Sequence, residues 1–324
     1  MEFIDCDVCH GAETKPLFKK QNNKGRDYFL GPIVVCKKCG LAYVNPRNED
    51  RLEKGTDLKK PNRKQENTQI WEPFIEEERW KKKDFADRLV IIKKYKAGGK
   101  LLDVGCGIGF FLQVAQQDGF EVKGADPSFL VSNYARERLG LDVFTGTLME
   151  MMSPKQSFDI ITSLHVLEHV PSPSQFLAET RRILKDDGIL VIEVPNMNNL
   201  LAKVIGFRFR SCFDCAQHYY YFTKKTLRLL LEKNGFEILK EKWVGRNMSV
   251  EWFIRTLERN NSIASKIAKS VIAFLKLGRK TIRINIGDKI LVVARKTPSG
   301  KGLDLIQTSK EGSISVETLI EISS

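Results

Sequence analysis

Residues 101–110 constrain the fold of this chain more than any other segment. They read Leu-Leu-Asp-Val-Gly-Cys-Gly-Ile-Gly-Phe, an apolar run that ends in an acid and three glycines at alternate positions. Apolar residues at helical spacing follow, which indicates a strand, a tight turn and a helix. Glycine allows the sharp turn and lets a ligand approach bare backbone, and the first turn of the helix leaves N–H groups free to meet that ligand. The segment therefore predicts an α/β domain with a ligand site at this turn.

A second acid indicates a ligand that carries a ribose. The glycine pattern differs from the G-x-G-x-x-G that is typical of dinucleotide sites. Residues 120–128 read as the next strand, which ends in Asp126, 21 residues after Gly105. An acid about 20 residues beyond a glycine-rich turn is well placed to accept hydrogen bonds from both ribose hydroxyls. A lone Asp in a turn could instead cap the following helix, but this register favours the ribose role.

A third informative segment joins a predicted strand to a group of titratable side chains. Residues 157–170 read Ser-Phe-Asp-Ile-Ile-Thr-Ser-Leu-His-Val-Leu-Glu-His-Val. Functional groups are expected at the carboxyl ends of parallel strands in a doubly wound sheet. His165, Glu168 and His169 are therefore candidates for acid–base catalysis. Glu168 and His169 could instead cap and hydrogen-bond the start of the next helix, and we expect His165 to line the cofactor pocket.

Another histidine lies just before a predicted helix cap. Residues 213–223 read Phe-Asp-Cys-Ala-Gln-His-Tyr-Tyr-Tyr-Phe-Thr, and Thr223 is predicted to cap a helix over residues 224–234. His218 is then a candidate general base that removes a proton from the acceptor. The alternative is a purely structural histidine in the pocket wall.

Four of the seven cysteines form two C-x-x-C pairs near the N-terminus. Two such pairs can place four thiolates around one tetrahedral ion, which in a reducing compartment indicates structural zinc, with free thiols or a degenerate site as the alternative. The predicted zinc ligands are Cys6, Cys9, Cys36 and Cys39. Four thiolates leave no open position for catalysis, so the ion would fold a small module. A third pair, Cys212 and Cys215, stands alone and is interpreted as two pocket thiols.

Together these motifs resemble those of class I S-adenosylmethionine (SAM) dependent methyltransferases. Residues 103–109 resemble their motif I, residues 157–170 resemble motif IV of small-molecule members, and residues 40–47 look like the zinc-ribbon lead-in of many bacterial members. With His-x-x-Tyr-Phe-Thr from residue 218 onward, the chain looks like bacterial methyltransferases of type 11 or 23 that are related to nucleotide-sugar methyltransferases. The resemblance covers most of residues 1–297.

The resemblance implies SAM as the cofactor. Asp103 and the glycine turn would frame its methionine end, Asp126 would hold the ribose, and the loop after the third strand would flank the adenine. The end of the fourth strand would reach the sulfonium methyl. The implied cofactor-binding residues are Asp103, Gly105, Cys106, Gly107, Gly109, Asp126, Pro127, Thr147, Leu148, Ser163, Leu164 and His165.

The resemblance also bears on the acceptor. In sugar C-methyltransferases of this group the corresponding stretch typically reads Tyr-His-Glu-His, whose first and last residues act in proton abstraction. Here residues 215–218 read Cys-Ala-Gln-His, so the histidine is retained and the tyrosine is not. We therefore expect methylation of a sugar hydroxyl, in a surface polysaccharide or a nucleotide sugar. The alternatives are an RNA-modifying enzyme, a lipid-quinone or other small-molecule O-methyltransferase, and a non-catalytic SAM-binding or zinc scaffold.

The predicted architecture is a doubly wound α/β fold with a seven-stranded Rossmann-like sheet and a small N-terminal zinc-ribbon module. The polar residues that follow the cysteines read as a linker rather than as part of a core. The predicted organisation is a zinc ribbon at 1–47, a linker or flap at 48–72, a methyltransferase domain at 73–297 with a basic helical insert at 246–284, and a flexible tail at 298–324.

The net charge of +13 is unevenly distributed. Residues 240–300 hold 14 Lys and Arg against four Asp and Glu, whereas residues 101–239 hold 14 against 16. The near-neutral centre argues against a uniformly basic nucleic-acid-binding protein, although the basic flanks allow a rim that attracts an anionic substrate or a lipid surface. The resemblance implies a small-molecule or saccharide substrate rather than nucleic acid. Residues 250–284 could form a lid over the acceptor or a peripheral contact with anionic lipid. With no signal peptide and no spanning segment, we expect a cytoplasmic location, at the inner membrane surface in the second case.

Overall fold

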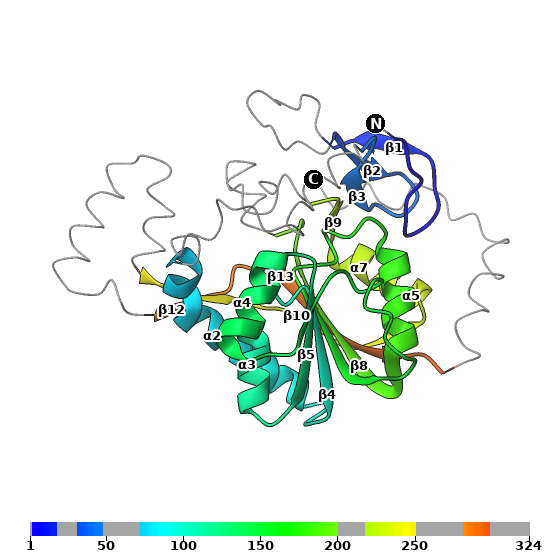
Figure 1. Ribbon diagram of the computed structural model, residues 1–324. Coiled ribbons are helices and arrows are strands. Elements are labelled where there is room, and N and C mark those ends of the chain that lie inside the picture. The colour runs from blue at the N-terminus through cyan, green and yellow to red at the C-terminus, as the bar shows by residue number, and fades with distance from the viewer. Residues whose placement is uncertain (1, 18–30, 48–71, 200–217, 251–280, 299–324) are drawn as a thin grey trace, which may run out of the picture.

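The computed structural model describes residues 2–17, 31–47, 72–199, 218–250 and 281–298. Its centre is a seven-stranded sheet with the strand order β10-β13-β8-β7-β4-β5-β6 (Figure 1). Strands β8, β7, β4, β5 and β6 run parallel, while β13 is antiparallel to both of its neighbours. The strands are β4 (Lys100–Val104), β5 (Glu121–Asp126), β6 (Val143–Thr145), β7 (Phe158–Leu164), β8 (Leu184–Pro195), β10 (Phe236–Trp243) and β13 (Lys289–Lys296). This is the seven-stranded doubly wound sheet that the sequence predicts.

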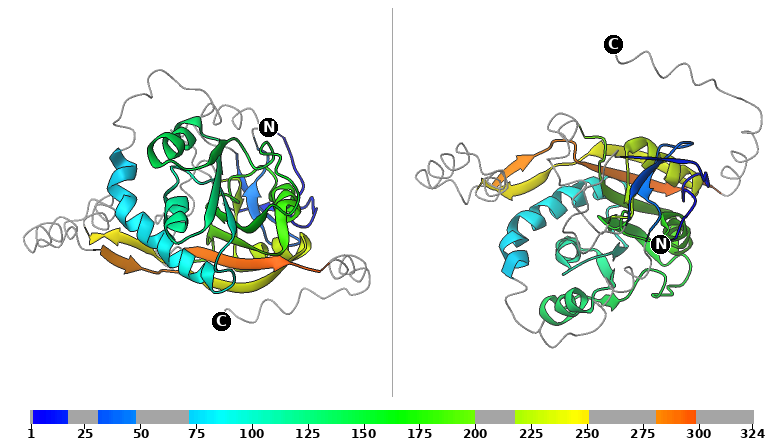
Figure 2. Two further views of the ribbon diagram at one scale, coloured as in Figure 1. Left: turned by 60° about the horizontal axis from the view of Figure 1, so that its bottom comes forward. Right: turned by 90° about the horizontal axis from the view of Figure 1, so that it is seen from above.

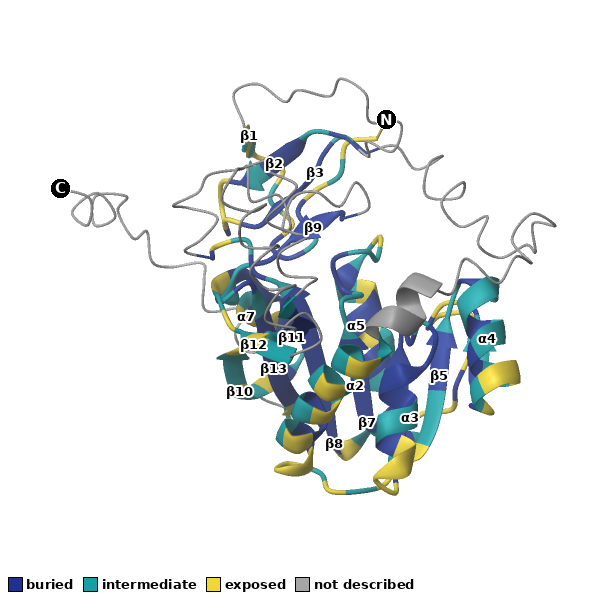
Figure 3. Ribbon diagram, turned by 90° about the vertical axis from the view of Figure 1, so that its left-hand side faces the viewer, coloured by how far each residue is buried: buried dark blue, intermediate teal, exposed yellow. Residues whose placement is uncertain are grey.

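Helices cover both faces of this sheet. Side chains alternate along a strand, so Leu101 and Ile160 belong to one core, whereas Leu102 and Ile161 belong to the core on the opposite face. Helices α2, α3 and α4 lie on the first face, and α5 and α7 lie on the second (Figure 1). The strands are accordingly buried between partly exposed helices (Figure 3). The helices are α2 (Glu72–Lys93), α3 (Phe110–Gln117), α4 (Phe129–Leu139), α5 (Pro173–Ile183) and α7 (Lys224–Lys233).

Helix α7 begins where the sequence predicts. The Thr223 hydroxyl accepts a hydrogen bond from Thr226 N at 3.2 Å, and the Thr226 hydroxyl accepts one from Thr223 N at 2.9 Å. This reciprocal capping box satisfies two backbone donors that the helix itself leaves free. Thr223 is thus confirmed as the N-cap of α7.

Strand β8 includes a sequence that is typical of turns. Residues 186–188 read Asp-Asp-Gly, but in the structure they belong to β8, which begins at Leu184. The register against β7 shifts there, because Phe158 pairs with Leu184 whereas Ile160 pairs with Ile189. The Asp-Asp-Gly residues therefore lie in a β-bulge, and the strand continues on both sides of it.

A second sheet holds the cysteine module against the central domain. Strands β1 (Thr14–Pro16), β2 (Ile33–Cys36) and β3 (Ala42–Val44) are joined by β9 (Tyr220–Tyr221), which comes from far along the chain. Ala42 pairs with Tyr221 and Tyr43 with Tyr220. The N-terminal strands therefore lie over the segment that follows His218 (Figure 1).

The predicted helical insert has β-structure at both of its ends. Strands β11 (Arg246–Ser249) and β12 (Thr281–Ile284) form a two-stranded antiparallel sheet beside α2 (Figure 2). It is anchored there because the backbone N and the side chain of Asn247 donate to Asp84 Oδ1 at 2.6 and 2.7 Å. The predicted helices of the insert, most of the linker and tail, and Cys212 and Cys215 lie outside the described residues. No helix among the described residues is long and apolar enough to span a membrane.

Candidate functional site

The glycine turn after β4 is shaped by backbone conformations that favour glycine. Gly105 has φ +71° and Gly107 has φ +55°. A Cβ on Gly105 would overlap the Val166 side chain, so packing alone demands glycine there. Apart from its chain neighbours, no described residue has an atom within 4 Å of a Cβ built on Gly107. Gly107 therefore borders open space, as expected of a turn that admits a ligand.

A cavity of about 230 Å³ opens beside this turn. Five of the predicted cofactor residues line it, namely Asp103, Gly105, Cys106, Leu164 and His165. The rest of the wall was not predicted from the sequence, and it includes Trp80 and Arg88 of α2, Glu193 of β8, Arg246 of β11 and Lys289 of β13. Glu193 was detectable in principle, because it is the one acid in the otherwise apolar run of residues 189–194.

Asp103 is a buried acid in the cavity wall. Its side chain is buried and accepts a hydrogen bond from the Thr162 hydroxyl at 2.6 Å. Burial raises the pKa of Asp103 to about 7, against the effect of the Thr162 hydrogen bond, and the charge of Asp126 adds to the increase. Ionising the buried Asp103 side chain on its own therefore costs free energy, and a positively charged ligand beside the carboxylate would offset that cost.

We expect Asp103→Asn to stabilise the protein at pH 8 and to weaken its ligand binding. An acid whose folded pKa lies above its unfolded value reduces stability progressively as pH rises from about 4 to 7. The upper bound on this cost is about 4 kcal/mol. Denaturant unfolding at pH 5 and pH 8 would check it, because the stability gain of the variant should be larger at pH 8. An equal gain at both pH values would contradict the assignment.

Asp126 braces the glycine turn from the end of β5. Its Oδ2 accepts a hydrogen bond from Gly107 N and its Oδ1 accepts one from Ser128 N, both at 2.9 Å. Burial raises the pKa of Asp126. Each carboxylate oxygen has a second lone pair, so the acid can hold the turn and still accept hydrogen bonds from a ribose.

Glu193 is the centre of a buried ion network. Arg88 donates to it from Nε at 2.8 Å and from Nη2 at 3.2 Å, and Lys289 Nζ lies 3.3 Å from Oε1. Burial alone would raise the pKa of Glu193, but Lys289, His165 and Arg88 together hold it well below its usual range. The network joins α2, β8 and β13 at the wall of the cavity.

His165 connects this network to a second group of side chains. Its ring lies between Glu193, with Nε2 3.1 Å from Oε1, and Glu168, with Nδ1 3.4 Å from Oε1. Burial and Lys289 act to lower the pKa of His165, but the two carboxylates outweigh them and the net pKa is raised. The residue has φ +62°, so its backbone turns sharply at the end of β7.

The other three catalytic candidates gather behind His165. Glu168, His169 and His218 each offer a ligand or proton-transfer atom, and these atoms lie within 4.8 Å of one another. The two histidine rings meet edge to face with centroids 4.6 Å apart. Burial and then His169 lower the pKa of His218 to about 4. Glu168 and His169 do not cap α5, because its N-cap is Ser172.

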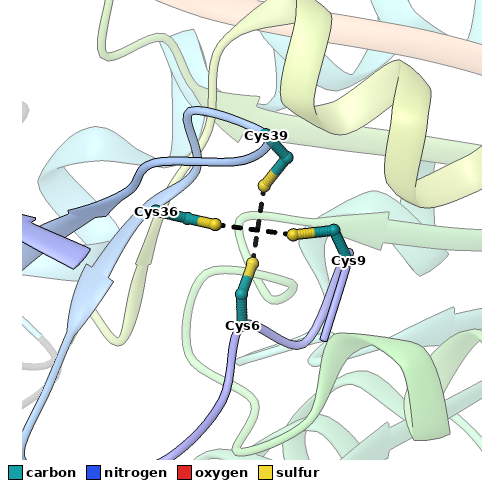
Figure 4. A group of neighbouring side chains, drawn as sticks. All are labelled: Cys6, Cys9, Cys36 and Cys39. Atoms are coloured by element: carbon teal, nitrogen blue, oxygen red, sulfur yellow. Dashed lines mark hydrogen bonds between the residues drawn. The ribbon is translucent and has the colours of Figure 1, made fainter. Parts of the chain in front are cut away.

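The four predicted zinc ligands come together in the N-terminal module. Figure 4 shows their sulfurs pointing to a common centre, with Cys6 Sγ 3.5 Å from Cys39 Sγ and Cys9 Sγ 3.4 Å from Cys36 Sγ. Tetrahedral zinc with bonds of about 2.3 Å requires sulfurs roughly 3.8 Å apart. All four cysteines are buried. The donor set and its spacing therefore fit a structural zinc ion.

The remaining predicted cofactor residues lie around the same strand ends. The Thr147 hydroxyl donates to Glu150 Oε2 at 2.9 Å, and the Leu148 side chain is buried in the core. The Ser163 hydroxyl is buried without a hydrogen-bond partner among the described residues. Gly109 is the N-cap of α3, and Pro127 is partly buried after β5. Their contacts with a cofactor stay predictions.

Curated relatives match about a third of the chain. A ubiquinone biosynthesis O-methyltransferase of Bradyrhizobium sp. (strain ORS 278) is 33% identical over 108 residues, which is 32% of this chain and 42% of the relative. One of the same name from Rhodopseudomonas palustris (strain BisB18) is 32% identical over 108 residues, with the same shares. The chain thus matches about two fifths of the length of these relatives.

Solved structures resemble the chain at low identity. A putative methyltransferase of Bacillus halodurans C-125 is 20% identical, covers 66% of this chain and 99% of its own, and has a TM-score of 0.48. A SAM-dependent methyltransferase of Archaeoglobus fulgidus is 20% identical, covers 69% and 99%, and has the same TM-score of 0.48.

The family model described as a methyltransferase domain matches more than half of the chain. The match spans residues 75–241, which is 167 of the 324 residues. The matched range contains the glycine turn, Asp126 and the group behind His165. The chain therefore belongs to the methyltransferase-domain family.

Proposed function

We propose that this protein transfers a methyl group from SAM to an oxygen atom of a small-molecule acceptor. The observation that carries the proposal is the cavity at the glycine turn, which Asp126 braces through Gly107 N, in a chain of the methyltransferase-domain family. When bound, SAM supplies a methyl carbon on a positively charged sulfur. An O–CH3 bond would form as the S–CH3 bond breaks, the acceptor proton would leave, and S-adenosylhomocysteine would be the product.

The cavity wall suits the zwitterionic methionine end of SAM. That end carries one ammonium and one carboxylate, and the wall offers groups of both signs within one small space. The acidic groups are Asp84, Asp103 and Glu193, and the basic groups are Lys81, Arg88, Arg246 and Lys289. Asp126 would hold the ribose from the adjacent strand, as the position of its carboxylate beside the turn allows.

Catalysis would rest mainly on holding the acceptor oxygen in line with the methyl group. His165 in the cavity wall and His218 behind it would assist by taking up the proton that the substrate hydroxyl loses. His218 is neutral at pH 7, because its pKa is lowered to about 4, so its lone pair is free but only weakly basic. His165 has a raised pKa and lies between two carboxylates, which makes it the stronger proton acceptor of the two.

A phenolic hydroxyl is a better acceptor hypothesis than the sugar hydroxyl expected from the sequence. The named relatives are ubiquinone biosynthesis O-methyltransferases, and the chain matches 42% of the length of each. A phenol with a pKa of about 10 loses its proton far more readily than a sugar hydroxyl, which suits the weak base at His218. The sugar hydroxyl is the second candidate, supported by the retained His218 and the aromatic residues after it.

Asp126→Ala should weaken SAM binding roughly 10- to 100-fold. Each hydrogen bond from a ribose hydroxyl to a carboxylate contributes about 1.5–3 kcal/mol, and the lost brace on Gly107 adds to the effect. Calorimetric titration with SAM would measure the change. Asp142→Ala is the matched control, because this exposed Asp pairs only with Lys123 among the described residues. Equal affinities for SAM in Asp126→Ala and the control would remove Asp126 from the cofactor site.

A further inference from the structure

We propose that Glu168, His169 and His218 form a second metal site, which binds a divalent first-row transition-metal ion. The three side chains offer one carboxylate oxygen and two imidazole nitrogens, all within 4.8 Å of one another. One carboxylate and two imidazoles form the ligand set that holds such ions on one side and leaves other positions open. This site differs in kind from the four thiolates, which would close around their ion.

The carboxylate of Glu168 provides an independent reason to expect a ligand. Glu168 is 1% exposed, yet neither of its oxygens has a hydrogen-bond partner among the described residues. An ionised carboxylate that is buried in this way is costly unless a cation or donors meet it. His165 Nδ1 lies 3.4 Å from Glu168 Oε1, so one titratable group lies beside the carboxylate, but no hydrogen bond from the described residues reaches either carboxylate oxygen. A divalent ion between Glu168 and the two histidines would bind the carboxylate and balance its charge.

The backbone holds the three ligands from two segments that are distant in sequence. Tyr219 N and Tyr220 N both donate to Glu168 O, at 2.8 and 3.3 Å, so His218 is fixed beside Glu168 and His169. His169 N donates to Val166 O at 2.8 Å, which closes the turn that carries the other two ligands. Metal bonds of about 2.0–2.2 Å would place the ligand atoms roughly 3–3.5 Å apart, so a modest inward rotation of the side chains would complete the site.

The position of the trio indicates what the ion would do. His165 lines the cavity and contacts Glu168, so the trio lies directly behind the wall where the cofactor is proposed to bind. With the ion bound, the metal would take the lone pair of His218, so the ion would replace His218 as the group that promotes loss of the acceptor proton. Open coordination positions would take the acceptor oxygen and lower its pKa, so that its proton leaves to water. The oxygen lone pair then forms the bond to the methyl carbon, and the C–S electron pair returns to sulfur. This catalytic role rests on the proposed function, whereas metal binding does not.

Cobalt titration of the full-length protein tests the site with a readout other than activity. The purified chain is stripped with a chelator, reloaded with Co2+, and assayed for metal per chain and for visible absorption. Thiolate-to-cobalt charge transfer reports the cysteine site only, so the two sites are read separately. The variants are Glu168→Gln, which is nearly isosteric, and His218→Ala. His10→Asn is the control, because His10 is exposed and belongs to neither set of ligands.

The expected result is two Co2+ per chain in the wild type and in His10→Asn, and one in each of the two site variants, with the thiolate band unchanged. Loss of one ligand should raise the dissociation constant of the second site roughly 100-fold or more. One Co2+ per wild-type chain, or two in both site variants, would overturn the proposal. If His218→Ala also loses the thiolate band through misfolding, Glu168→Gln decides. SAM titration of the same wild-type sample tests the proposed function separately, because its failure leaves the metal count readable.

Discussion

Replacing Cys9 by serine will abolish methyl transfer while leaving SAM binding in place. The loss of transfer is expected to be roughly 100-fold or more, because a displacement of about 1 Å at a catalytic group can cost that much. The described residues that line the cavity all lie between Trp80 and Lys289, outside the N-terminal module and outside β9. The cysteine module would therefore act on His218, the proposed catalytic group, without contributing to the cavity.

The reason is a chain of contacts from the cysteines to His218. Strand β3 pairs with β9, and Val44 N donates to Tyr219 O at 2.9 Å. Arg47 donates to Pro171 O at 2.8 Å, which ties the end of the module to the loop after β7. Structural zinc in small modules contributes about 10–16 kcal/mol of apparent binding energy, so a lost ligand should unfold this sheet. His218 would then lose its position beside Glu168.

The same module also holds the start of α5. Asp7, between two of the cysteines, accepts hydrogen bonds from the Ser172 hydroxyl at 2.7 Å and from Ser174 N at 2.8 Å. A carboxylate at a helix N-terminus stabilises the helix.

Lys38→Ser is the matched control for Cys9→Ser, because Lys38 is exposed between the other pair of cysteines. Zinc content, SAM affinity and methyl transfer are measured for both variants. Two outcomes would refute a role of the cysteine module in positioning His218. One is full methyl transfer by Cys9→Ser that contains no zinc, and the other is a loss of SAM binding in Cys9→Ser.

Arg88→Met will lower the free energy of unfolding by about 3–5 kcal/mol. Removing one partner of a buried ion pair leaves the other charge without compensation. Arg88 and Glu193 are each 3% exposed at the side chain, and Arg88 also donates to Gly245 O at 2.8 Å. Lys289 stays near Glu193, so we expect the lower end of the range. The midpoint of thermal unfolding should fall by roughly 4–7 °C for a chain of 324 residues.

Two further variants make this result specific. Arg138→Met changes the same residue type at an exposed position of α4 and should alter stability by less than about 0.5 kcal/mol. Arg88→Met/Glu193→Met removes both charges and should recover a large part of the loss, since apolar replacement of a whole buried pair is often neutral. A double variant as unstable as Arg88→Met alone would show that the cost is lost packing of the arginine stem and not an unpaired charge.

The sequence predicted those parts of the fold that depend on local pattern. The apolar strands β4, β5 and β7, the glycine turn and the Thr223 cap each have a signal within a few residues. Cys6, Cys9, Cys36 and Cys39 could be grouped because metal ligands come in tight pairs. Asp126 could be placed beside the turn because strand spacing in a doubly wound sheet is regular.

Features that depend on distant partners were missed. Strand β9 is two residues long, so it has no periodicity, and only its pairing with β3 defines it. Arg88 and Glu193 are 105 residues apart, and nothing near either residue indicates the other. Asp7 and Ser174 are likewise 167 residues apart. These contacts decide the charge of the cavity and the position of His218, so the site needed the tertiary structure.

Transfer of a labelled methyl group from SAM into a cell extract tests the central claim most directly. The extract is fractionated into lipids, sugars, RNA and protein after incubation with the wild type, Asp126→Ala and His218→Ala. The proposed function predicts label in a small-molecule fraction, lipid for a phenolic quinone precursor and saccharide for a sugar hydroxyl, and its strong reduction in both variants. Label confined to RNA or protein, or no label in any fraction from a wild-type protein that binds SAM, would contradict it.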